Sequence, residues 1–184
     1  VPAKARARLA GAPARSLARR PTRPESTAAR ALLDEPLALL RRSSALGDVA
    51  LDLAVAGDLP PVRTVPAEAT QAVLHGLLAV LAARPASVRL TMVAAHTRIG
   101  GGRERPTVSL GIEAAALGPD EARWLVDIPA GGDGFVGDVA AGSPAREGLA
   151  AALFVQRRLG GDLAASRTRD GVRLDYVWPA AATS

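Results

Sequence analysis

Residues 146–179 read REGLAAALFVQRRLGGDLAASRTRDGVRLDYVWP and predict three elements in succession. A Ser-Pro pair before this stretch is a good helix cap and first turn, and a Gly-Gly pair within it ends the apolar period, so a helix is expected over residues 144–159. Apolar residues then alternate with polar ones along residues 172–178, which indicates a strand. An Asp-Gly turn joins that strand to residues 163–168, so the chain ends in a β-hairpin.

The elements expected before this stretch come from apolar periodicity and from Gly and Pro breaks. They are a helical segment at 26–42 interrupted by Pro36, a strand at 49–55, a helix at 67–83, strands at 88–95 and 108–112, and one or two helical turns at 119–126. Hairpins mixed with isolated helices predict an α+β fold. We expect a two-layer α/β sandwich with a mixed sheet and its helices on one face.

The core is expected to consist of Leu, Val and Ala, because aromatic residues make up only 3% of the chain. On the two long helices, Leu74, Leu77, Leu153 and Val155 are predicted to be largely buried. Trp178 is expected to cap the edge of the sheet.

The 184 residues divide into a basic arm and a nearly neutral body. Residues 1–30, rich in Pro, Ala and Arg, carry eight basic residues and one acidic residue, a net charge of +7; residues 31–184 carry fifteen and seventeen, a net charge of −2. We therefore predict an arm or linker at 1–30 and one folded domain at 31–184. The charge of the arm is suited to binding nucleic acid or acidic lipid. A solvated linker is the alternative, because no aromatic residues are interleaved to stack on bases.

The composition also excludes several classes of site. The chain has no cysteine, so disulfides, thiol catalysis and thiolate zinc sites are ruled out, and a cytoplasmic location is expected. The longest apolar run, residues 72–83, is too short to span a bilayer, so we expect no transmembrane segment there. Because the first residue is valine, the chain is consistent with a piece of a longer protein.

Four phrases of the sequence, in chain order, resemble the catalytic and ATP-binding domain of bacterial histidine kinases, in the GHKL ATPase superfamily. They are LGDVALDLAVAGDLPP at 46–61, similar to the first strand and its "dLP"; QAVLHGLLAVLAARP at 71–85, similar to the first motif helix; the strand pair at 87–95 and 107–129 that leads to a D-x-G-x-G motif; and residues 146–179, similar to the G-x-G-L-G motif, its helix and the last hairpin. The resemblance implies the histidine-kinase ATPase fold, a role in two-component signalling, and ATP with Mg²⁺ as ligands.

The residues that would perform this chemistry are largely replaced. Ala79 stands at the Asn that would hold Mg²⁺, and His75 at the earlier Asn. In place of D-x-G-x-G the chain has EAAAL, beginning at Glu113, and in place of G-x-G-L-G it has REGLA, which keeps only Gly148. Side chains at glycine positions would crowd the approach of the backbone to phosphate. Glu113 and Gly148 are therefore the candidate residues of a vestigial nucleotide site.

Other candidates have simpler structural interpretations. His75 is more often a half-buried polar residue on a helix than a ligand or phosphoacceptor, and His96 more often a surface residue. The glycine-rich stretches 100–102 and 131–142 match no Walker pattern, so flexible loops are favoured over phosphate loops, although the second falls where the family has its ATP lid. Residues 1–45 contain no histidine that could serve as a phosphoacceptor.

These observations predict a non-catalytic, histidine-kinase-like signalling domain that acts through a protein partner and uses no cofactor. One alternative is a divergent ATP-binding domain, in which Glu113 and Gly148 hold the nucleotide and arginines such as Arg146, Arg157 and Arg158 replace the metal at the phosphates. Another is a module that binds nucleic acid or an acidic surface through the arm. The state of the glycine positions favours the first interpretation over the second.

Overall fold

The computed structural model describes residues 23–43, 45–99, 102–131 and 143–182. Its elements are β1 (Glu25–Thr27), α1 (Ala31–Arg42), β2 (Ala50–Val55), β3 (Val62–Thr64), α2 (Pro66–Ala82), β4 (Ser87–Arg98), β5 (Glu104–Ala115), α3 (Pro119–Ala130), α5 (Pro144–Arg158), β6 (Asp162–Arg167) and β7 (Gly171–Pro179). None of the described helices is long and apolar enough to cross a membrane.

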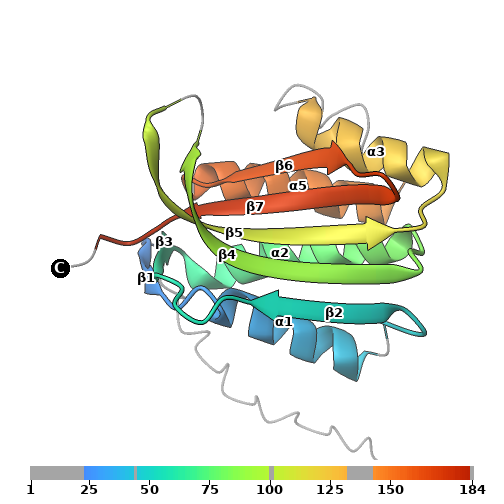
Figure 1. Cartoon of the computed structure of the whole chain (residues 1–184), viewed down its shortest axis with the longest axis horizontal. Coiled ribbons are helices and arrows are strands. Elements are labelled where there is room, and N and C mark those ends of the chain that lie inside the picture. Colours follow the sequence, from blue (N-terminus) through green and yellow to red (C-terminus); the bar gives the residue numbers. More distant parts are fainter. Residues whose placement is uncertain (1–22, 44, 100–101, 132–142, 183–184) are drawn as a thin grey trace, which may run out of the picture.

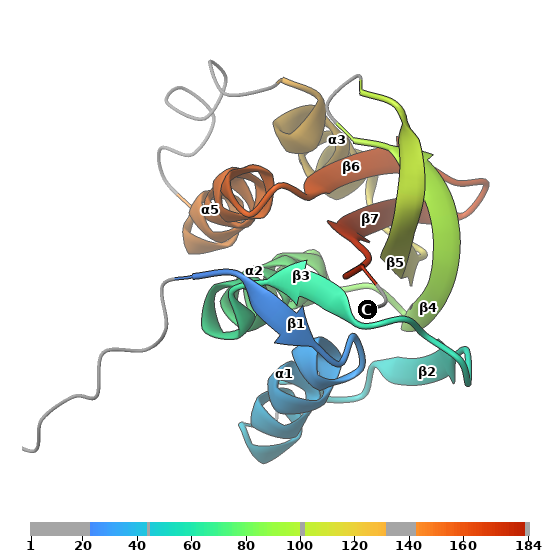
Figure 2. The same ribbon diagram turned by 90° about the vertical axis from the view of Figure 1, so that its left-hand side faces the viewer.

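Five strands form one mixed sheet in the order β2-β4-β5-β7-β6. β2 runs parallel to β4, and every other neighbouring pair is antiparallel. The helices cover one face of this sheet, and the other face is open (Figures 1 and 2). Within the helical layer, α2 packs between α1 and α5, and α3 packs against α5 and the edge strand β6. The predicted two-layer sandwich, with both long helices on one face, is confirmed.

A single apolar core lies between the sheet and the helices. Leu77 and Leu153 are buried in it as predicted, whereas Leu74 and Val155 are only half-buried at its margin. The prediction for Trp178 was wrong. Its side chain is fully buried and stacks on Tyr176 with 5.9 Å between ring centroids, because β7 is an inner strand of the sheet.

Several elements extend further than the sequence pattern indicated. Pro36 does not split α1: the proline is itself buried, so its packing offsets the hydrogen bond that it removes from the helix. α3 continues to Ala130 because Leu125 and Ile128 bury the same face of the helix as Ala122. β4 and β5 each have twelve residues and pair along their whole length.

A second, two-stranded sheet was not expected from the sequence. β1 pairs antiparallel with β3, and the following Ala29 is buried in the core. Residues 1–22 of the predicted arm lie outside the described residues. The chain from Glu25 onward is packed on the body.

Candidate nucleotide-binding region

Glu113 lies on the open face of the sheet. Its neighbours on β5, Ile112 and Ala114, are completely buried and point to the helices. Because side chains alternate along a strand, Glu113 points the other way. Its directly opposite partners are Arg89 on β4 and Arg173 on β7.

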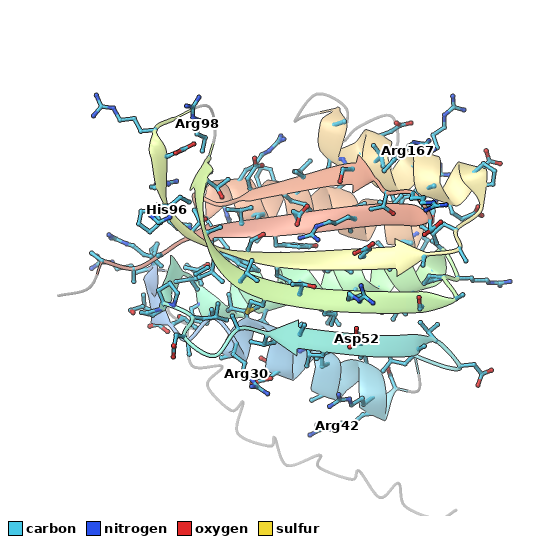
Figure 3. All side chains as sticks on the ribbon, in the orientation of Figure 1. Arg30, Arg42, Asp52, His96, Arg98 and Arg167 are labelled. Atoms are coloured by element: carbon cyan, nitrogen blue, oxygen red, sulfur yellow. The ribbon has the colours of Figure 1, made fainter. Side chains whose placement is uncertain are left out.

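Glu113 belongs to a row of facing residues that crosses the whole sheet and alternates in charge over its first four strands. From β2 to β6 the row reads Asp52, Arg89, Glu113, Arg173 and Ser166, each opposite the next. Arg89 Nε donates a hydrogen bond to Asp52 Oδ2 at 3.0 Å, on the face turned toward the viewer in Figure 3. Opposite charges on adjacent strands stabilise a sheet by about 0.2–1 kcal/mol per pair. Arg173 Nε in turn donates a hydrogen bond to Asp175 Oδ1 on its own strand at 2.8 Å. Glu113 also lines an open cavity of about 360 Å³ on this face.

Gly148 lies on the helical side of the sheet, buried in α5 where this helix meets α2. A Cβ atom added to Gly148 would lie 3.1 Å from Nδ1 of His75, so the glycine lets the two helices approach each other closely. His75 Nε2 lies 3.5 Å from Nε2 of Gln71 on the same helix. The sheet therefore separates Glu113 from Gly148, and the structure does not bring the two candidate residues together.

On α2, the helix that would hold the metal, small residues pack against β7. Ala79 is completely buried in the core. The hydroxyl of Tyr176 lies over Gly76 and donates a hydrogen bond to the carbonyl of Ala72 at 3.0 Å. Burial raises the pKa of the Tyr176 hydroxyl well above its usual value, so this group stays a protonated donor. Side chains of the sheet therefore occupy the space beside this part of α2.

The arginines of α5 also have partners. Arg146 stacks over the Trp124 ring of α3, with its guanidinium carbon 5.6 Å from the ring centroid. At the other end of the helix, Arg157 Nε lies 3.6 Å from Asp162 Oδ1 and Arg158 pairs with Glu68 of α2. These contacts join α5 to three neighbouring elements, and they engage the arginines that the sequence had suggested as phosphate ligands.

Solved structures share this arrangement of strands and helices, although no family model and no curated protein matches the chain. The catalytic domain of histidine kinase ThkA has a TM-score of 0.59 at 12% identity, covering 85% of this chain and 95% of that one. The mycobacterial sensor histidine kinase MprB gives 0.55 at 16% identity, with 87% and 99% covered. The chain has the fold of a histidine-kinase catalytic domain. Full-length ShkA, solved in complex with AMPPNP, gives 0.53 at 20% identity, and the match covers 87% of this chain and 32% of ShkA.

The remaining candidates of this histidine-kinase-like domain are dispersed. His96 is exposed on β4, whereas His75 lies on α2. Gly100, Gly101 and residues 132–142 lie outside the described residues. Within the described ranges, no group of three or more His, Cys, Asp or Glu side chains is placed to hold a metal ion.

Sequence analysis missed a groove on the outside of the helical layer. It has a volume of about 530 Å³ and lies between α1 and α2, lined by apolar side chains such as Leu39 and Leu74 and by polar ones such as Glu35. Leu39, Leu78 and Phe154 are among the exposed large apolar residues of this layer, at 42%, 39% and 58% exposure. A signal was present in the sequence, because α2 carries more leucines than one buried face accommodates.

Proposed function

We propose that this histidine-kinase-like domain is non-catalytic and acts through protein–protein contacts in a two-component-type signalling pathway of the bacterial cytoplasm, without ATP or Mg²⁺. The observation that carries the proposal is the separation of Glu113 from Gly148 by the sheet. A nucleotide held by both residues would have to contact opposite faces of the sheet at once.

The chemistry of the individual positions supports the same conclusion. Mg²⁺ requires oxygen ligands, and Ala79 supplies none. The inward-facing neighbours of Glu113 on β5, Ile112 and Ala114, carry no acceptor for an adenine amino group. Near the start of α5, Arg146 lies against Trp124 and Ala150 is buried, so this turn lacks the bare backbone that phosphate binding uses.

The outside of the helical layer supports a role in protein contacts. Phe154, one of only two phenylalanines in the chain, is the most exposed large apolar side chain of the described residues. Leu39 and Leu78 are exposed on the neighbouring helices, and the groove between α1 and α2 has an apolar lining with polar side chains beside it. Such surfaces are typical of protein-binding sites.

Incubation with γ-labelled ATP and Mg²⁺ tests the absence of catalysis. We expect no label on the protein and no release of labelled phosphate above the level without protein, while an active histidine-kinase catalytic domain in parallel shows turnover. Hydrolysis that exceeds the blank and disappears in a Glu113→Gln variant of unchanged melting temperature would contradict the proposal and favour the divergent ATP-binding alternative.

A further inference from the structure

β4 and β5 continue past the sheet as a two-stranded ribbon. The pairing of β4 with β2 ends at Met92, and the strand pairing of β5 with β7 starts at Thr107. Beyond these points the two strands still pair with each other, with His96 opposite Pro106 and Arg98 opposite Glu104. We call the described residues 96–99 and 102–106 the β4–β5 ribbon; it rises from one end of the sheet in Figures 1 and 2.

The ribbon is basic although the body that carries it is not. It contains three arginines and one glutamate, a net charge of +2 with His96 neutral, whereas residues 31–184 as a whole carry −2. The side chains of Arg98, Arg103 and Arg105 are exposed. Figure 3 shows Arg98 extending away from the sheet near the end of the ribbon. Its ion pair with Glu104, 3.9 Å apart between exposed side chains, is too weak to neutralise it.

The base of the ribbon is fixed to the body. Arg105 Nη2 donates a hydrogen bond to the carbonyl of Gly160, in the turn between α5 and β6, at 3.1 Å. Thr107 donates a hydrogen bond across the pair to the carbonyl of Ala95 at 3.2 Å. The first bond links the base of the ribbon to the turn before β6, and the second links β5 to β4.

The residue types of the ribbon favour one class of polyanion over the others. There is no Phe, Tyr or Trp in residues 96–106 to stack on the bases of a single strand. Ile99, its one large aliphatic side chain, is half-buried, so the ribbon has no apolar wedge to insert into a bilayer. Guanidinium groups match phosphate oxygens in geometry, and a two-stranded ribbon fits the major groove of B-form DNA.

We propose that the β4–β5 ribbon binds double-stranded DNA by contacting its phosphates with Arg98 and Arg103. The composition of the chain favours the same partner, since residues 1–23 carry seven basic residues and no acidic one. This inference does not depend on the absence of ATP binding.

Fluorescence anisotropy of a labelled 20-base-pair DNA duplex, titrated with the full chain at several salt concentrations, tests the proposal. The variant is Arg98→Gln with Arg103→Gln. The matched control is Arg41→Gln with Arg42→Gln, which removes the same charge from exposed arginines in the last turn of α1. At low salt we expect the ribbon variant to bind about tenfold or more weakly. Its slope of log affinity against log salt should be smaller by about 1.8, because each phosphate contact contributes about 0.9.

The control pair should retain the wild-type affinity and slope, and Arg98→Lys with Arg103→Lys should retain most of the slope. Equal losses in the ribbon and control variants would reduce the effect to net charge and overturn the proposal. So would wild-type protein that fails to bind the duplex at low salt. A loss of binding to phosphatidylserine vesicles with unchanged duplex binding would also overturn it and assign the ribbon to a membrane surface.

Discussion

Replacing Leu77 by alanine is expected to lower the free energy of unfolding by about 2–5 kcal/mol, the range for a leucine truncated in a packed core. Leu77 is 2% exposed and lies on the face of α2 that packs into the apolar core. The lost transfer free energy and the remaining cavity both contribute to this cost. Urea unfolding followed by circular dichroism measures it.

Leu78→Ala is the matched control, since the next residue of the same helix undergoes the same change in composition and helix propensity. Leu78 is 39% exposed, so we expect its truncation to cost well under half as much as that of Leu77. Equal effects of the two substitutions, or an unchanged midpoint for Leu77→Ala, would contradict the placement of the core.

Gly76→Ala is expected to destabilise the protein by about 2–4 kcal/mol, the cost of overpacking together with that of a lost hydrogen bond. An alanine Cβ at this position would lie 1.9 Å from the hydroxyl oxygen of Tyr176, so the buried ring must shift and release the carbonyl of Ala72. The sign of the change in stability is informative, because Gly→Ala inside an unobstructed helix stabilises a protein by roughly 0.5–1 kcal/mol.

A double-mutant cycle isolates the contact between Gly76 and Tyr176. Tyr176→Phe removes the hydroxyl and its hydrogen bond, and we expect a cost of about 1 kcal/mol. Gly76→Ala should then cost less in the Phe background, although not nothing, since the ring carbon Cζ would still lie 2.8 Å from the new Cβ. Additive effects, or a stabilising Gly76→Ala, would show that the hydroxyl does not occupy the space over Gly76.

The sequence predicted best those elements whose pattern repeats over several turns or strand residues. α2, α5 and the β6–β7 hairpin have long apolar periods with clear terminal residues, and their bounds agree with the structure to within a few residues. β1 and β3 have three residues each, too few for any period to be recognised, and they form through tertiary pairing: β1 with β3, and Val62 of β3 with Ala180. The packing of Pro36 in α1 likewise depends on tertiary contacts.

The candidate site was harder to predict because its geometry depends on the face of the sheet to which each side chain points. Counting along the motif selected Glu113, but a shift of one residue along a strand moves a side chain to the opposite face. Pairing with Arg89 and Arg173 sets that face, and both partners are distant in sequence. The contact of Gly148 with His75 depends in the same way on how α2 and α5 pack.

Calorimetric titration of the full chain with ATP, with and without Mg²⁺, tests the central claim most directly. The replaced metal ligand, adenine acceptor and phosphate-facing glycines should each weaken binding by about 1–3 kcal/mol. Since 1.4 kcal/mol corresponds to about tenfold, a micromolar site would become millimolar or weaker. We therefore predict no measurable heat of binding at micromolar concentrations in either condition. Saturable micromolar binding in either one would contradict the account and establish the domain as a divergent nucleotide-binding module.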